Sequence, residues 1–137
     1  MGDNFLNRDG MGVLEMKKIT SGEHFMAQSA SVFEEIVSVL STKMGVRLVS
    51  VSAPQSVACY QVSDIERQVQ LRLVLIPLAN GHLLGRVSWL DWRGVDHVCC
   101  YINESLDCLV MAPNGCWEKQ KKSPELLCIQ GFESLVA

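Results

Sequence analysis

The sequence contains no long apolar run, and this absence excludes a membrane-spanning helix. Its longest stretch without charge or strong polarity runs from Leu73 to Ala79 and is interrupted by Pro77, whereas a transmembrane helix needs about 20 consecutive apolar residues. The N-terminus lacks the basic start and the apolar segment of roughly 7–15 residues that mark a secretory signal. We therefore expect a cytoplasmic protein with no membrane partner.

An excess of basic residues is also missing. The formal net charge is −3 and the sequence pI is about 5.6, so the chain has no general attraction for phosphate backbones, and we expect no nucleic-acid partner. Charged residues make up only 20% of the chain and hydrophobic residues 48%, which excludes a chain kept unfolded by its own charge. The length of 137 residues suits one domain with one hydrophobic core.

Several motifs that carry chemistry are absent. The sequence has no GxxxxGK[ST] or GxGxxG phosphate loop, no GxSxG nucleophile elbow and no CxxC pair. We therefore expect no cofactor and assign no catalytic or metal-binding residue. The six cysteines lie mainly in apolar, strand-like segments, where free cysteine behaves as a small hydrophobic residue, so we expect reduced and mostly buried thiols.

Hydrophobic periodicity divides the chain into an arm and one domain. Residues 1–28 contain four of the ten glycines and no sustained period, which predicts a flexible N-terminal arm, followed by a single domain over residues 29–137. Apolar residues at helical spacing then predict a helix from Val32 to Met44; they are Phe33, Ile36, Val37, Leu40 and Met44. Ser31 and Glu34 form a capping-box pattern at its start, and Gly45 can close its end.

From Val46 onward the apolar period changes from 3.6 to 2, which predicts consecutive short strands in an antiparallel meander. The predicted strands are Val46–Ser52, Val57–Val62, Arg67–Ile76, Leu83–Leu90 and Val95–Ile102. Gly85 could introduce a bulge in the fourth of these. Residues 103–111 fit either a helical turn or a sixth strand, and we favour the strand.

A turn at Pro113-Asn114-Gly115 and a solvated loop over Lys119–Lys122 come next in the prediction. Ser123 and Pro124 are typical of a helix start. They predict a short C-terminal helix, broken near Gly131. The predicted fold class is therefore α+β, with an N-terminal helix, a mainly antiparallel meander of about five or six strands and a short C-terminal helix.

Two small clusters could carry chemistry. His97 shares one face of a predicted strand with Cys99 and precedes Cys100, so a cysteine-dependent enzyme that pairs His97 with Cys99 or Cys100 is one alternative. A zinc-binding regulator, with ligands gathered from several strands, is another. Against both alternatives we favour the interpretation that the thiols belong to the core. Strand alternation alone places pairs such as His97 and Cys99 on one face.

The candidate partner-binding residues are Trp92, Arg93 and Trp89, because tryptophan and arginine are enriched at binding hot spots. Trp92 and Arg93 fall in a predicted turn over Asp91–Gly94. Trp89 is also a candidate for the core. An alternative for Trp92 is that its ring folds over the sheet edge.

The predicted helices are thin cover for about six strands, and an uncovered sheet face or edge favours partner capture or self-association. We therefore expect a non-enzymatic protein-binding module, an adaptor or a dedicated chaperone, with a protein partner or a second copy as a homodimer. The plan of a small acidic chain with a leading helix and an antiparallel sheet is similar to that of the class I chaperones for type III secretion effectors. Those proteins usually end in a longer helix.

Overall fold

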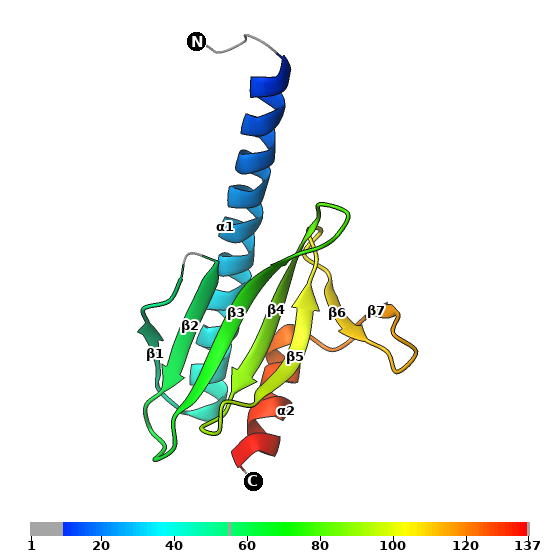
Figure 1. Cartoon of the computed structure of the whole chain (residues 1–137). Coiled ribbons are helices and arrows are strands. Elements are labelled where there is room, and N and C mark those ends of the chain that lie inside the picture. Colours follow the sequence, from blue (N-terminus) through cyan, green and yellow to red (C-terminus); the bar gives the residue numbers. More distant parts are fainter. Residues whose placement is uncertain (1–9, 55, 137) are drawn as a thin grey trace.

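The computed structural model describes residues 10–54 and 56–136, and it describes side chains from residue 23 onward. The described elements are α1 (Gly10–Met44), β1 (Leu48–Val51), β2 (Val57–Val62), β3 (Val69–Pro77), β4 (Leu83–Leu90), β5 (Asp96–Ile102), β6 (Cys108–Met111), β7 (Trp117–Lys119) and α2 (Pro124–Val136). The strands form one antiparallel sheet in which each strand pairs with the next along the chain (Figure 1). The predicted α+β class, with its leading helix, meander and C-terminal helix, is confirmed.

The first helix is longer than the sequence pattern predicts. It begins at Gly10 rather than at Val32, so the predicted arm is helical from residue 10, while residues 1–9 lie outside the described residues. Ser31 consequently lies inside the helix and cannot cap it. The predicted end is correct, because Gly45 has a φ of 67° and its N–H donates to the carbonyl of Ser41 at 3.0 Å.

Glu34, the other half of the predicted cap, pairs with the sheet instead. Its carboxylate accepts a hydrogen bond of 2.6 Å from the hydroxyl of Tyr60 on β2. This hydrogen bond, together with burial and the negative charge of Glu34, raises the pKa of Tyr60 to about 12. The contact ties the outer side of α1 to the β2 strand.

The second half of the chain differs from the prediction in two elements. The favoured strand within residues 103–111 is present as β6, but β7 lies partly in the predicted Lys119–Lys122 loop and makes the sheet seven-stranded rather than five- or six-stranded. The second helix runs through Gly131 without a break. A Cβ atom at Gly131 would lie 3.3 Å from Cδ1 of Trp89 and 3.5 Å from Sγ of Cys99. This glycine therefore allows close packing of helix on sheet and does not end the helix.

A bulge is present in the β4–β5 ladder, away from Gly85. Val87 pairs with Cys100 and Ser88 pairs with Val98, so Cys99 is the extra residue of β5. The bulge breaks the strand alternation between Cys99 and Cys100, whereas His97 and Cys99 both lie on the helix side of the sheet.

Both helices pack on the same face of the sheet, which is seen in front of them in Figure 1. The core between them contains Phe33, Ile36 and Leu40 of α1, Cys128 and Phe132 of α2, and the inward residues of β2 to β5. Trp89 lies at its centre with no exposed surface. Its indole N–H donates to the carbonyl of Cys128 at 2.9 Å, and its ring lies 4.9 Å from that of Phe132.

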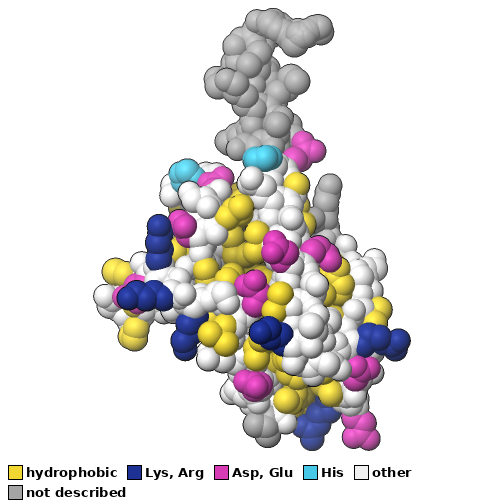
Figure 2. Space-filling view, turned by 180° about the vertical axis from the view of Figure 1, so that it is seen from behind, with side chains coloured by type: hydrophobic (Ala, Val, Ile, Leu, Met, Phe, Trp, Pro, Cys, Tyr) yellow, Lys and Arg dark blue, Asp and Glu magenta, His cyan; other side chains and the backbone are white. Residues whose placement is uncertain are grey.

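Figure 2 shows the helical side of the molecule, where acidic and basic side chains are interspersed among hydrophobic ones. The N-terminal part of α1 extends well past the sheet (Figure 1). Neither helix in the described part of the chain combines the length and the apolar character that crossing a bilayer requires.

Candidate functional site

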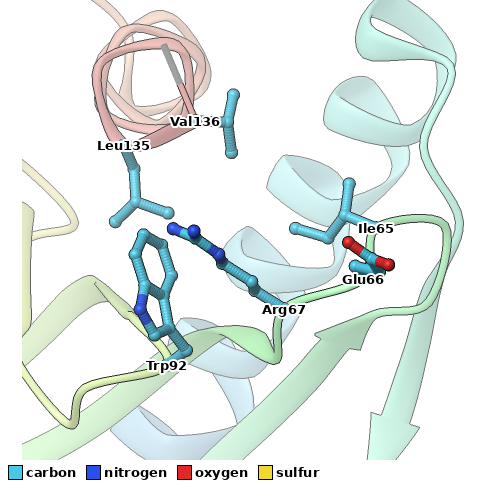
Figure 3. A pocket seen from close by; sticks show the side chains of 6 residues that line it. All are labelled: Ile65, Glu66, Arg67, Trp92, Leu135 and Val136. Carbon is cyan, nitrogen blue, oxygen red and sulfur yellow. The ribbon is translucent and has the colours of Figure 1, made fainter.

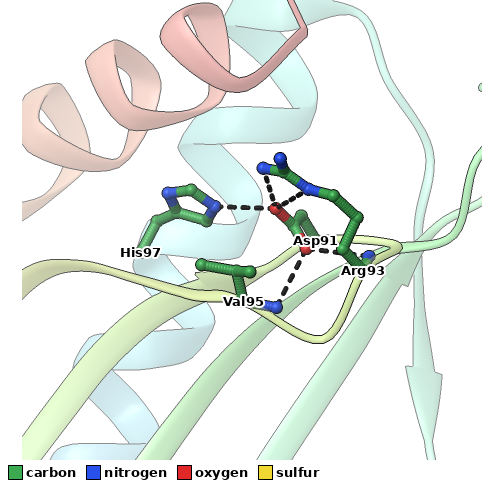
Figure 4. A network of polar contacts seen from close by, with 4 residues as sticks. All are labelled: Asp91, Arg93, Val95 and His97. Atoms are coloured by element: carbon green, nitrogen blue, oxygen red, sulfur yellow. Dashed lines mark hydrogen bonds and ion pairs between the residues drawn. The ribbon is translucent and has the colours of Figure 1, made fainter.

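The turn between β4 and β5 is organised by one buried carboxylate, that of Asp91 (Figure 4). Its Oδ1 accepts hydrogen bonds from the backbone N–H groups of Arg93, at 2.8 Å, and Val95, at 2.9 Å. Its Oδ2 lies 2.7 Å from Nη2 of Arg93 and 2.9 Å from Nε2 of His97. A carboxylate that joins two backbone groups and two side chains fixes the shape of the turn.

These contacts also set the acidity of the carboxyl group. Burial alone would raise the pKa of Asp91, but the hydrogen bonds from His97, the Val95 N–H and Arg93 outweigh burial and hold this pKa well below its ordinary value of 3.8. Asp91 is therefore ionised at neutral pH. Its ordered turn presents the next residue, Trp92, to solvent.

Two guanidinium groups lie over the ring of Trp92, with the Cζ atoms of Arg67 and Arg93 at 4.3 Å and 5.3 Å from the ring centroid. Beside it opens a cavity of about 440 Å³ between the β2–β3 loop and the end of α2 (Figure 3). We call this the Trp92 pocket; it is lined by Ile65, Glu66, Arg67, Trp92, Leu135 and Val136. Such cation–π stacking holds the indole in place while 39% of the residue remains exposed.

Trp92 also borders a second hollow, of about 220 Å³. Its lining residues are Gln68, Gln70, Leu90, Asp91, Trp92 and Gly94. Gln70 and Leu90 are cross-strand partners whose side chains point away from the helices. Trp92 therefore stands at the rim of the sheet face opposite the helices.

No helix among the described residues covers that opposite face, which we call the uncovered face. Residues paired across the ladders share a face, and three rows of side chains run across it. The rows are Val49, Gln61, Gln70, Leu90 and Asp96; Val51, Cys59, Arg72, Ser88 and Val98; and Val57, Val74, Arg86, Tyr101, Leu109 and Lys119. The flanks of the uncovered face are apolar and its middle is polar.

Large apolar side chains of the uncovered face meet solvent. The exposed fractions are 46% for Val49, 47% for Val98, 52% for Met111 and 42% for Trp117. The Trp117 ring stands edge-on to that of Tyr101, with centroids 4.7 Å apart. A hollow of about 230 Å³ separates β5 from β6 here, because these strands pair only at Tyr101 and Ile102.

Two arginines and one aspartate occupy the middle of the uncovered face. Asp96 lies 3.9 Å from Nη2 of Arg72 and 3.5 Å from Nε of Arg86, and all three side chains are between 27% and 29% exposed. Among the described residues, Nε of Arg72, Nε of Arg86, Oδ1 of Asp96 and Oγ of the buried Ser88 have no hydrogen-bond partner. This is an under-satisfied polar centre within an apolar surface.

The structure separates the three sequence-predicted partner-binding residues. Trp92 and Arg93 are exposed at the ordered turn, whereas Trp89 is completely buried in the core and has no surface to offer a partner. Sequence reasoning missed Arg72 and Arg86. Each alternates with apolar residues along its strand, but only the strand register brings the two together beside Asp96.

The alternative pairing of His97 with a thiol is not made in this structure. The His97 ring binds Asp91, and the thiol of Cys99 points toward the His97 carbonyl at 3.9 Å. Burial raises the pKa of the Cys59 thiol. A hydrogen bond with Cys108, together with burial, raises the pKa of Cys100, and a hydrogen bond with Cys99, together with burial, raises that of Cys128. In the described part of the chain, no group of three or more His, Cys, Asp or Glu residues is arranged to hold a metal ion.

Exposure of the six thiols varies more than predicted. Cys59, Cys100 and Cys128 are buried, Cys99 and Cys108 are half-buried, and Cys116 is exposed. All six are free. Cys116 lies in the β6–β7 hairpin, where its turn geometry rather than core packing decides its position.

Comparison of the chain with protein-family models, curated proteins and solved structures gives no match. The geometry of the uncovered face and of the Trp92 turn is therefore the basis for a functional proposal.

Proposed function

We propose that the chain is a non-enzymatic protein-binding module, an adaptor or a dedicated chaperone, that docks a protein partner on the uncovered face of its sheet. The observation that carries this proposal is the position of both described helices on one side of a seven-stranded sheet. The other side leaves large apolar side chains in contact with solvent. Apolar surface gathered on one face of a folded domain is typical of an interaction site.

The residue types on this face support the same proposal. Aromatic residues, methionine and arginine are enriched at protein interfaces, and the uncovered face presents Tyr101, Trp117, Met111 and two arginines. Trp92 adds a second exposed indole at the rim, held by Arg67 and Arg93. Rigid aromatic side chains lose little conformational entropy when a partner covers them.

Site-directed photo-crosslinking tests the proposal. The photoreactive residue p-benzoylphenylalanine is placed at Val98 of the uncovered face or, as a matched control, at Leu126 of α2, which is 40% exposed and also apolar. In cells that make the protein, we expect irradiation to join a defined protein to position 98 and not to position 126. Mass spectrometry of the adducts identifies the occupant, including a second copy of the chain.

Equal adducts at the two positions, or none at Val98, would contradict the proposal, because a docking face must be contacted more often than a random exposed site. Thermal unfolding of both variants provides the folding control. Exposed substitutions of this kind change stability by less than about 0.5 kcal/mol in most proteins.

A further inference from the structure

The charge of the uncovered face differs in sign from that of the whole chain. The chain carries a formal net charge of −3. In the middle of the uncovered face, however, the two guanidinium groups of Arg72 and Arg86 face the single carboxylate of Asp96. This cluster therefore has an excess of one positive charge.

The two arginines are also short of acceptors. Asp96 is too far from Arg72, at 3.9 Å, and from Arg86, at 3.5 Å, to form close hydrogen bonds. The Nε atoms of both arginines have no hydrogen-bond partner among the described residues. These Nε atoms are buried, so a ligand can reach only the exposed parts of the two side chains, which are 28% and 29% exposed. Two parallel Nη–H groups of a guanidinium can bind a carboxylate end-on.

The surroundings of this pair are apolar. Val74 and Val57 continue the row of Arg86 on one side, Tyr101 and Leu109 continue it on the other, and Val98 ends the row of Arg72. A ligand that only supplied negative charge would leave these side chains in water. A polypeptide that carries an acidic side chain next to apolar ones would match both features.

From this placement we infer that the uncovered face binds a partner segment that inserts an aspartate or glutamate carboxylate between Arg72 and Arg86, with apolar residues on either side of it. The inference rests on the proposed protein-binding function and names the chemistry of the partner. A second copy docked face to face fits less well, because it would bring two positively charged clusters together.

Peptide selection against the full-length protein tests the inference. A phage-displayed library of random dodecapeptides is selected on the wild-type chain, and the most enriched peptide is synthesised with its acidic residue intact or changed to the corresponding amide. We expect enriched sequences with Asp or Glu beside apolar residues. Loss of the carboxylate should weaken binding about tenfold or more, the range for a hydrogen bond to a charged group.

Variants of the arginine pair complete a double-mutant cycle. In R72Q/R86Q we expect the acidic and the amide peptide to bind equally weakly, since the interaction is already lost. R72K/R86K keeps the charge and guards against a folding defect, and it should also bind the acidic peptide more weakly because lysine cannot form the forked contact. K121Q/K122Q, with the same change in net charge on an exposed loop, is the control and should bind as the wild type does.

Nuclear magnetic resonance locates the contact directly. Addition of the acidic peptide should shift the Nε–Hε signals of Arg72 and Arg86 and leave that of Arg47, which donates to Ser63, unchanged. Peptides that bind the uncovered face equally well with the amide would overturn the inference but not the proposed function. If inorganic phosphate displaced the bound peptide as effectively as free acidic peptide does, the inference would be overturned in favour of a phosphate site.

Failure to select any peptide, or selection of peptides whose binding survives both V98K and R72Q/R86Q, would count against the inference and the proposed function together. A dimer in sedimentation that V98K dissociates would assign the face to a second copy and overturn the acidic-segment inference alone.

Discussion

At the scale of single residues, Asp91 has the largest number of partners in the described polar network. Replacement by asparagine keeps its size but removes the charge that both Arg93 and His97 bind. We expect D91N to lower the midpoint of thermal unfolding by several degrees at pH 7, since it weakens a buried, charge-assisted network. The matched control is E66Q, which removes one negative charge from an exposed position of the β2–β3 loop.

The difference in unfolding midpoint between the wild type and D91N depends on pH with a defined sign. The pKa of Asp91 is lower in the folded chain than its ordinary value of 3.8. Asp91 therefore contributes stability that is present above that value and lost as the pH falls through the folded-state pKa. The gap in unfolding midpoint between wild type and D91N should shrink below about pH 4. A gap that stayed constant from pH 7 to pH 3, or an equal loss in E66Q, would contradict this account.

For Ser29 we expect the opposite effect, a substitution that stabilises the protein. This residue of α1 is fully buried, and its Oγ has no hydrogen-bond partner among the described residues. An unsatisfied buried polar group costs about 1–3 kcal/mol, so S29A should raise the free energy of unfolding. The exposed Ser31 in the same helix is the control, because S31A gains only the higher helix propensity of alanine. Denaturant titration should show S29A to be more stable than S31A by about 1 kcal/mol.

Ser29 also explains why the sequence pattern placed the start of α1 too late, at Val32 rather than before Phe25. Phe25, Ser29 and Phe33 are spaced four residues apart and all are buried, so the apolar stripe of the helix continues toward the N-terminus with a serine in the middle. A polar residue at that position interrupts the periodicity by which a helix is recognised. Beyond Val32 the stripe is unbroken, and there the prediction located the helix and its end at Gly45 correctly.

At the scale of elements, strands with a buried apolar face were predictable, and the shortest strand, β7, was not. The bounds of β2 and β4 agree with the prediction, because each has an apolar face that must be buried on the helices. The three residues of β7 are all exposed and have no buried face to generate a pattern. The arginine pair was hidden for a related reason, since its members lie on different strands and only the register joins them.

Gly131 shows how tertiary packing overrides local propensity. In an isolated helix valine is a better helix former than glycine. Here, however, a side chain at Gly131 would meet Trp89 and Cys99, which belong to the buried side of the sheet. We expect G131V to lower the free energy of unfolding by roughly 2 kcal/mol through overpacking. The neighbouring exposed position offers Q130V as control, with an expected change below about 0.7 kcal/mol in urea titrations. Equal effects of the two substitutions would mean that α2 is not closely packed at Gly131.

At the scale of the whole molecule, stability is concentrated where the helices cover the sheet. Most inner residues of β3 and β4 are completely buried, and the two strands pair from Gln70–Leu90 to Pro77–Leu83. The β6–β7 hairpin joins the sheet through two residue pairs and carries no helix in the described part of the chain. The apolar side chains at this end of the uncovered face therefore belong to a weakly attached unit, which can adjust to a partner at little cost to the core.

Hydrogen exchange measures this division. We expect the amides of β3 and β4 to exchange only through global unfolding, and those of β6 and β7 through local opening that requires at least about 2 kcal/mol less free energy. Trp117 anchors the hairpin through its edge-on contact with Tyr101. W117A should therefore speed exchange in β6 and β7 about threefold to tenfold, the value of one aromatic pair, and leave β3 and β4 unchanged. W92A removes another exposed indole, at the β4–β5 turn, and should not affect the hairpin. Uniform protection across the sheet, or an equal response to both substitutions, would show that the hairpin is an integral part of the core and not an adjustable edge of the uncovered face.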